Sequence, residues 1–193
     1  MKNRVAEICY ADITGEKTDI CKKIKLIVDN IHGKTLATNF YAFELDREAV
    51  MEQLKKRHTL IDVYTDVKTA DGHIFRIFVM IVTSRRNNQQ KINSYAQGSR
   101  VRLVRKKLIE DIVKYASTIK ADTLAHEVLT DSINTRLEQV AQKVIIGSKL
   151  QVYKLKTVKR GNIDYKQLSQ HTKAVEANKD ENPEAKNLLT REE

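Results

Sequence analysis

The chain has 193 residues, of which 41% are hydrophobic, so it is long enough for one domain with a sizeable core and too short for two large domains. Six glycines, one proline and no tryptophan exclude a collagen-like chain and argue against a broadly disordered one. No apolar run approaches the roughly 20 residues that a membrane-spanning helix needs. We therefore expect a soluble, intracellular protein that does not contact membranes.

The net charge of +10 and the isoelectric point of about 9.5 indicate a polyanionic partner, and the charge is concentrated in two segments. Residues 84–120 contain ten lysines and arginines against two acidic residues, and residues 149–161 contain five against none. The rest of the chain is slightly acidic. A basic surface that served only solubility would be spread more evenly, so the two segments are candidate contact surfaces.

Alternation of apolar and polar residues predicts strands in the first half of the chain. The expected strands of this strand-rich region, residues 4–83, are 4–13, 22–31, 35–45, 61–69 and 73–83. His32-Gly33 and Asp71-Gly72 have the composition of hairpin turns. The nearly continuous apolar run 75–82 indicates a central, buried strand.

Helical periodicity replaces this alternation in the second half of the chain. The expected helices are Asp46 to near His58 and, in the helical region 99–144, Ser99 to about Ala116, 123–129 and 131–144. Asp46, Ser99 and either Thr130 or Asp131 are suitable N-caps. Arg105 falls by angle within the apolar stripe of the Ser99 helix, so we expect the first turns of that helix to project beyond the core.

The remaining residues complete a single predicted domain, residues 1–172. Residues 149–172 are expected to form a basic strand and a short helix, and residues 173–193 a flexible acidic tail. The fold class is therefore α+β, with a small mixed β-barrel or a curved sheet, packed helices, and an extension formed by the basic loop 84–98 and the helix that follows it.

The most informative stretch is “SRRNNQQKINSYAQGSRVRLVRKK”, residues 84–107, which contains no acidic residue. Its candidate nucleic-acid contacts are Arg85, Arg86, Asn87, Asn88, Lys91, Tyr95, Gln97, Arg100, Arg102, Arg105, Lys106 and Lys107. Cations bind phosphates, amides bond to sugar or base edges, and a tyrosine ring stacks on an unpaired base. The alternative is a solvated loop and an ordinary charged helix face, but repulsion between uncompensated like charges favours a nucleic acid.

The second basic segment, “LQVYKLKTVKRG” at residues 150–161, has two interpretations of equal weight. Lys154, Lys156, Lys159 and Arg160 contact RNA, or they belong to an exposed edge strand that lysines protect from aggregation. The sequence does not choose between them.

We expect no enzymatic activity, no metal and no cofactor, because no set of residues has the spacing that such chemistry needs. Gly33-Lys34-Thr35 has the form of the end of a phosphate-binding loop, but Val28 stands where that pattern requires a glycine.

A family resemblance is carried by four motifs. They are “DVKTADG” at residues 66–72, “RRNNQ” at 85–89, “SYAQ” at 94–97 and “VRLVRKKLIEDI” at 101–112. In these motifs the chain closely resembles the archaeal and eukaryotic small-subunit ribosomal protein family called S-three-a, also called e-type S-one, and weaker similarity extends over roughly residues 4–170. Members of the family usually begin with a strongly basic extension ahead of the strand that starts here near Arg4.

This resemblance implies a structural protein on the platform of the small ribosomal subunit near the messenger exit, with a role in subunit assembly and translation. Its implied partners are small-subunit ribosomal RNA, neighbouring small-subunit ribosomal proteins of the platform, and messenger RNA near the exit. Motif matching gives the RNA-facing role to the candidates of residues 84–107 other than Lys91. The alternative function is a free RNA chaperone or regulatory RNA-binding module that uses the same surface.

The loop 84–98 contains a single large aliphatic side chain, Ile92. Apolar burial therefore cannot offset the entropy that is lost when the loop becomes ordered. We expect this loop to become ordered only when RNA is bound.

Overall fold

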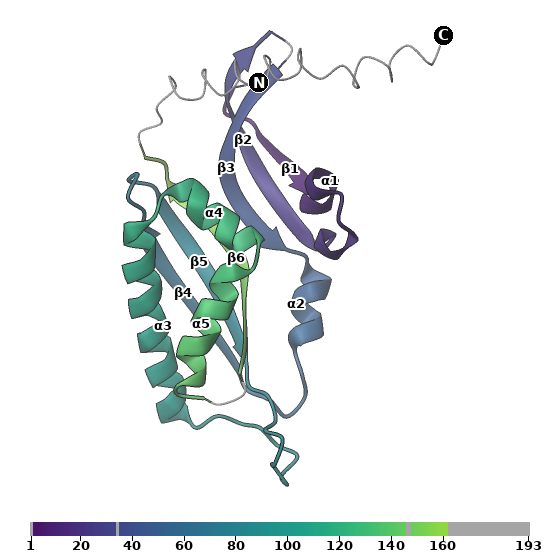
Figure 1. The fold of residues 1–193 in the computed structure, drawn as a ribbon, viewed down its shortest axis with the longest axis vertical. Coiled ribbons are helices and arrows are strands. Elements are labelled where there is room, and N and C mark those ends of the chain that lie inside the picture. The colour runs from purple at the N-terminus through teal and green to yellow at the C-terminus, as the bar shows by residue number, and fades with distance from the viewer. Residues whose placement is uncertain (1, 34, 146–147, 162–193) are drawn as a thin grey trace, which may run out of the picture.

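The computed structural model describes residues 2–33, 35–145 and 148–161, which form one curved antiparallel sheet with helices packed on one face (Figure 1). The expected acidic tail, 173–193, and the short helix expected before residue 172 lie outside these described residues. The α+β class expected from the sequence is confirmed.

The strands are β1 (Val5–Cys9), β2 (Lys22–His32), β3 (Thr35–Leu45), β4 (Leu60–Lys68), β5 (Ile74–Val82) and β6 (Lys149–Lys159). The helices are α1 (Tyr10–Thr14), α2 (Arg47–Gln53), α3 (Gly98–Thr118), α4 (Ala121–Leu129) and α5 (Ser132–Gln142), with a 3₁₀ turn at Lys17–Asp19.

The strand order is β1-β2-β3-β6-β5-β4, and each neighbouring pair is antiparallel. The sheet stays open, because β1 and β4 are its two edges. Of the two forms expected from the sequence, the curved sheet is the one observed. Register shifts between β2 and β3 and between β5 and β6 mark bulges, which bend and twist the strands that carry them.

The β4–β5 hairpin turns at Asp71-Gly72 as expected, through a three-residue loop, residues 70–72, between Thr69 and His73, and Gly72 adopts a left-handed φ of 80°. Alternate residues of β4 from Ile61 to Val67 are buried, as the period of two predicts. The turn is also bonded to a helix. The Asp71 carboxylate accepts a hydrogen bond of 2.9 Å from the Ala121 N–H at the start of α4. This contact fixes the hairpin relative to the helices.

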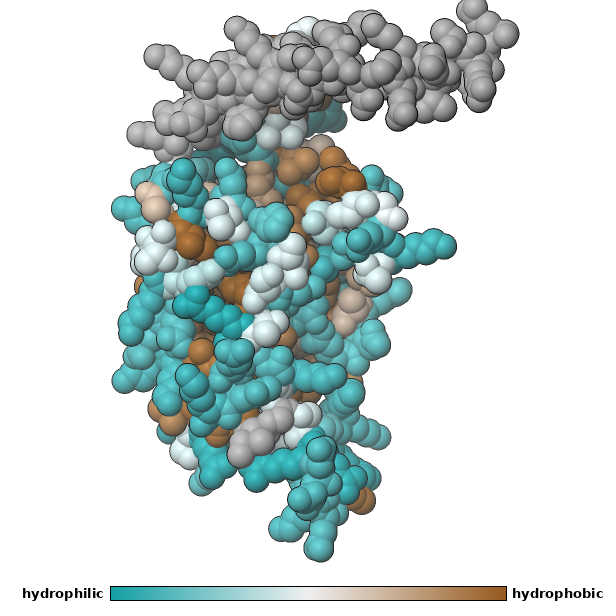
Figure 2. Space-filling view, in the orientation of Figure 1, coloured by the Kyte–Doolittle hydropathy of each residue, from teal (hydrophilic) through white to brown (hydrophobic). Residues whose placement is uncertain are grey.

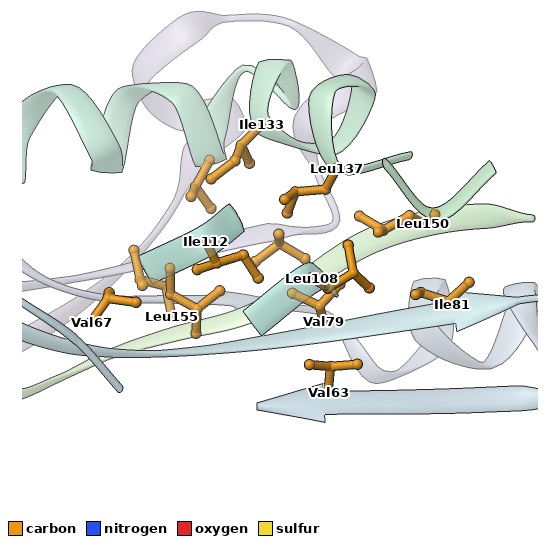
Figure 3. Close-up of a cluster of buried hydrophobic side chains, with 14 of the residues drawn as sticks. Val63, Val67, Val79, Ile81, Leu108, Ile112, Ile133, Leu137, Leu150 and Leu155 are labelled. Carbon is orange, nitrogen blue, oxygen red and sulfur yellow. The ribbon is translucent and has the colours of Figure 1, made fainter. Parts of the chain in front are cut away.

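The core lies between the sheet and helices α3, α4 and α5 (Figure 3). The buried stripe of α3 consists of Val101, Val104, Leu108, Ile112 and Ala116. It packs over β4 and β5, while Ile133 and Leu137 of α5 pack over β6. The helical period predicted from the sequence therefore matches the side of α3 that is buried.

The N-terminal strand is shorter than expected. The sequence predicts a strand over residues 4–13, but β1 ends at Cys9 and residues 10–14 form α1. Gly15 closes this helix with a φ of 76°, and its N–H bonds to the Ala11 carbonyl. A glycine C-cap supports a single turn of helix even in a segment that alternates like a strand.

The helix expected from Asp46 to near His58 is also shorter. The Asp46 carboxylate accepts a bond of 2.9 Å from the Arg47 N–H, which confirms the N-cap, but α2 ends at Gln53. Leu54 has extended backbone angles, and the chain then turns toward β4.

The basic strand expected near residue 150 is confirmed as β6, and it lies in the interior of the sheet between β3 and β5. The edge-strand interpretation of this segment is therefore wrong. Leu150, Val152 and Leu155 are buried against the helices. The Asn134 side chain of α5 accepts a bond of 3.0 Å from the Val152 N–H, beside the bulge in the β5–β6 register.

A buried ion pair joins the end of β6 to β2. Asp29 is only 1% exposed, and it lies at the register shift between β2 and β3. Its carboxylate accepts hydrogen bonds from Arg160 and, at 2.6 Å, from the Asn39 amide. Removal of one partner would leave a buried charge without compensation.

We predict that Arg160→Met lowers the free energy of unfolding by about 3–5 kcal/mol, because it leaves the Asp29 carboxylate buried and unpaired. Urea denaturation measures this loss. Adding Asp29→Asn to the same chain should recover most of it. Arg76→Met, which breaks the exposed pair with Asp66, serves as the control and should cost much less; equal losses in the two single variants would contradict the prediction.

Candidate nucleic-acid interface

The loop between β5 and α3 is fixed at its second half. The Ser94 N–H donates to the Arg57 carbonyl at 2.9 Å, and the Thr83 hydroxyl donates to the Ser94 carbonyl at 2.6 Å. The Ala96 N–H donates to the Thr59 hydroxyl oxygen at 2.9 Å. These bonds attach the end of the loop, near Ser94 and Ala96, to the segment that precedes β4 and to the residue that follows β5, although the loop contributes little apolar surface.

The first half of the loop is organised by the side chain of Gln89. Its side-chain amide donates to the backbone carbonyls of Lys91 and Asn93 at 2.7 and 2.8 Å. The Arg85 guanidinium donates to the backbone carbonyl of Gln89 at 2.8 Å. Sequence reasoning gave Gln89 no role, because an amide that bonds to its own loop looks the same in sequence as one that faces a ligand. The structure assigns Gln89 to the support of the loop.

A polar hollow of about 730 Å³ lies between this loop and the start of α3. Six of the residues expected to contact RNA line it: Arg86, Asn88, Lys91, Tyr95, Gln97 and Arg100. Tyr95 is 65% exposed, so its ring is accessible for stacking. The structure thus brings together cations, amides and an aromatic ring that are up to fourteen positions apart in sequence.

The other candidates of this segment lie around the hollow. Arg85 lines a second, larger hollow of about 1020 Å³ that also reaches α2 and α5, and Asn87 is exposed on the loop. Arg102, Arg105, Lys106 and Lys107 are exposed on α3 beyond the hollow. Together they extend the cationic surface along the first half of the helix.

The cations of residues 84–107 are not neutralised within the protein. All eight are exposed, and among the described residues none of them forms an ion pair with a carboxylate. Figure 2 shows the corresponding end of the molecule covered by hydrophilic side chains. This end of the protein therefore has an uncompensated positive field, which attracts phosphates.

The start of α3 adds to this field. Gln97, and not the expected Ser99, is its N-cap, no side chain caps the helix, and its first turn has no acidic residue. Arginines at a helix N-terminus oppose the helix dipole at a cost of a few tenths of a kcal/mol each, and a bound phosphate would offset that cost.

The sequence predicts that the first turns of α3 project beyond the core. This prediction is wrong, because Val101 and Val104 are buried. Arg105 is nevertheless exposed, although it lies by angle near the buried stripe. The reason is the position of α3, which packs over β4 at the edge of the sheet (Figure 1). One flank of the helix therefore extends past the edge.

The second basic segment does not join the first into one surface. In β6, Lys149 lies opposite Val82 near the loop, whereas Lys159 lies opposite Ile74 at the other end of β5. At about 3.3 Å per residue, the Arg160 end lies about 30 Å farther along the sheet.

Most cations of this segment also have partners within the protein. Lys154 forms an ion pair of 3.0 Å with Glu44, the Lys156 ammonium lies 5.5 Å from the centre of the Phe78 ring, and Arg160 pairs with buried Asp29. Lys159 is exposed. These contacts favour a role in the sheet for Lys154 and Arg160, and they give no support to an RNA role for those two residues.

Among residues 2–33, 35–145 and 148–161, no group of three or more histidine, cysteine or acidic side chains is placed to hold a metal ion. In the same part of the chain, no helix combines the length and the apolar character that crossing a bilayer requires.

Comparison with known proteins decides the family. The model described as “Ribosomal S3Ae family” matches residues 1–161. The small ribosomal subunit protein eS1 of Babesia bovis is 33% identical over 198 residues, in an alignment that covers all of this chain and 75% of that protein. The chain belongs to the ribosomal S3Ae family. The resemblance seen in the sequence motifs is confirmed, and the family is one of ribosomal structural proteins and not of enzymes.

In the sheet of this S3Ae-family protein, the Glu44 carboxylate has a lowered pKa. Lys154, together with Lys25 at 3.2 Å, holds the pKa of Glu44 below its usual value of 4.5. A carboxylate with a lowered pKa in the folded state contributes stability above its unfolded pKa and loses that contribution as the pH falls through the folded pKa.

We therefore predict that Glu44→Gln makes the free energy of unfolding less sensitive to pH below about 4.5. Urea denaturation at a series of pH values from about 6 to about 3 measures this dependence. Glu110→Gln, on the exposed surface of α3, is the matched control and should leave the slope unchanged. An identical slope in wild type and Glu44→Gln would show that the pair with Lys154 contributes nothing.

The sequence predicts that the whole loop 84–98 becomes ordered only with RNA. Given the bonds at Ser94 and Ala96, we now expect this only of the residues before Ser94. We predict that in the free S3Ae-family protein the amides of Ser94 and Ala96 are protected from hydrogen exchange, because both are bonded to the segment before β4. The amides of residues 90–93 should exchange rapidly and become protected when RNA is added. Rapid exchange at Ser94 and Ala96 would show that the attachment is not stable.

Proposed function

We propose that this chain is a structural constituent of the small ribosomal subunit that binds small-subunit ribosomal RNA through the loop 84–98 and the first half of α3. The observation that supports this most directly is the hollow that Arg86, Lys91, Arg100 and the exposed Tyr95 line together, without any carboxylate among the lining residues. Such a hollow accommodates an unpaired base and the phosphates beside it.

The family supports the ribosomal part of this proposal, since a relative with 33% identity is named small ribosomal subunit protein eS1. We further propose a location on the platform near the messenger exit, beside other small-subunit proteins and within reach of messenger RNA, with function in the cytoplasm. This location is supported only by the resemblance of the motifs.

The RNA-binding surface is tested with the double variant Arg86→Glu and Arg100→Glu. It should weaken binding to protein-free small-subunit ribosomal RNA by at least about 2 kcal/mol, taking each charge-assisted hydrogen bond as about 1.5–3 kcal/mol. It should also reduce the slope of log K against log salt by about 0.7–0.9 for each phosphate that the variant no longer binds. Filter binding at several salt concentrations gives both values.

The control is Lys17→Glu with Lys114→Glu, which makes the same change in net charge at exposed positions that do not line the hollow. This variant should bind RNA nearly as tightly as wild type, and both double variants should melt at the wild-type temperature. If the two double variants weakened binding equally, net charge and not this hollow would determine RNA affinity.

Sedimentation of cell extract through a sucrose gradient separates the ribosomal role from that of a free RNA chaperone or regulatory module. A structural constituent remains with the small subunits after a high-salt wash. A protein found mainly at the top of the gradient would favour the free module, which uses the same hollow.

A further inference from the structure

The long helices cover only one face of the sheet. Helices α3 and α5 pack on that face (Figure 1), so the residues of β4 alternate between buried and exposed. On the other face, near the loop end, the Gln53 side chain of α2 bonds to Gln151 of β6. We call the part of this other face that lies on β4, β5 and β6, between Gln151 and the Asp71-Gly72 turn, the open face. Its outward residues are Asp62, Tyr64, Asp66 and Lys68 of β4, Ile74, Arg76 and Phe78 of β5, and Tyr153, Lys154, Lys156 and Lys159 of β6.

A row of three aromatic rings crosses the open face. Tyr64 of β4 lies opposite Phe78 of β5, and their ring centres are 6.3 Å apart. Tyr153 of β6, at the bulge in the β5–β6 register, continues the row, with its ring centre 5.9 Å from that of Phe78. The row therefore forms a flat aromatic surface that spans three neighbouring strands.

Packing within the sheet does not account for all of this row. Cross-strand aromatic pairs stabilise sheets, and that role is sufficient for Phe78 and Tyr153, which are half-buried. Tyr64 is 68% exposed, more than any other large hydrophobic side chain among the described residues, and it lies on the edge strand β4. Its ring is therefore accessible to a flat ligand such as an unpaired base.

Two ion pairs neutralise part of the charge of the open face. The Arg76 guanidinium donates to both oxygens of Asp66, at 2.6 and 2.7 Å, and Lys154 pairs with Glu44 of β3 at 3.0 Å. Asp62 is the other carboxylate of the face, and it has no ion pair among the described residues. These groups alone would leave the face with one negative charge.

Three further lysines outweigh that carboxylate. Lys68 and Lys159 are exposed, and both lie opposite Ile74, one on each side of it. Lys156 is nearer to the aromatic row, with its ammonium 5.5 Å from the centre of the Phe78 ring. None of the three lysines forms an ion pair with a carboxylate in the part of the chain that the structure describes. Positive charge is therefore concentrated between the row and the turn, whereas Asp62 lies on the other side of Tyr64.

We propose that the open face is a second RNA site, which binds an unpaired nucleotide by stacking its base on Tyr64. The neighbouring phosphates lie on the turn side of the ring, at Lys68, Lys156 and Lys159, and away from Asp62. This inference rests on the proposed RNA-binding function and adds to it a surface of different residues. Because every base has a face that can stack, the site selects unpaired over paired RNA and does not read sequence.

The test uses fluorescein-labelled hexaadenylate, titrated with the full-length protein while anisotropy is recorded. The parent is the double variant Arg86→Glu with Arg100→Glu, which has lost two cations of the hollow. In this parent, Tyr64→Ala should weaken binding by about fivefold or more, because it removes one stacked base. Tyr64→Phe retains the ring and should bind within about twofold of the parent.

Substitutions of charged residues separate RNA from a basic peptide as the ligand of the open face. Lys68→Gln with Lys159→Gln should weaken hexaadenylate binding and reduce its salt dependence, because two cations near the phosphates are lost. Asp62→Asn should leave binding unchanged or make it tighter, since it removes a charge that repels phosphate, whereas it would weaken binding of a basic peptide. Leu60→Ala, at a 41% exposed position of the same face of β4, is the matched control and should bind within about twofold of the parent. Melting temperatures verify the fold of each variant.

The proposal is overturned if Tyr64→Ala binds as tightly as its parent, if Asp62→Asn weakens binding, or if a stable RNA duplex binds as tightly as hexaadenylate. Failure of the two RNA sites is distinguishable. If Arg86→Glu with Arg100→Glu alone abolishes hexaadenylate binding, the open face is not a site and the hollow is. If that double variant binds like wild type while Tyr64→Ala in the wild-type chain does not, the hollow fails and the open face stands.

Discussion

Burial of the apolar stripe of α3 against β4 and β5 is the interaction on which the rest of the structure depends. Leu108 and Ile112 are 0% and 2% exposed, and truncation of such residues to alanine typically costs about 2–5 kcal/mol each. Because the helix is fixed by its middle, its N-terminal turn is held at one end of the sheet, where the basic loop returns to the body of the protein. The core thus positions the hollow before any RNA is present, which reduces the entropy lost on binding.

The charges are segregated along the sheet. Toward β2, β3 and β6, cations and carboxylates are matched in pairs such as Lys154 with Glu44 and Arg160 with buried Asp29. At the loop end, the cations have no such partners among the described residues. A long molecule with one unneutralised end orients itself in the field of a polyanion, so electrostatics can select the end that makes contact.

Patterns among neighbouring residues predicted many of the strands and helices of this fold. The features that they did not predict depend on contacts between residues far apart in the sequence. The β4–β5 hairpin and the buried side of α3 follow from period and turn chemistry, which depend on neighbouring residues. The position of β6 depends on its pairing with both β3 and β5, and its contacts with β3, like the pairing of Arg160 with Asp29, join residues more than 100 positions apart. Six of the residues proposed to contact RNA line one hollow because they are close in the chain, but sequence reasoning could not show that Gln89, which also lines the hollow, bonds to the backbone of its own loop.

The interior place of β6 has a consequence for how the protein is made. This strand is the last in the described chain, yet it joins β1–β2–β3 to β5–β4. During synthesis the two groups of strands emerge first, and each exposes an edge that only β6 can fill. The nascent chain therefore holds two unjoined half-sheets until residue 159 has left the ribosome, and in that interval it is most exposed to aggregation. Completion of the sheet therefore waits for the synthesis of β6, which follows all the other strands in the described chain.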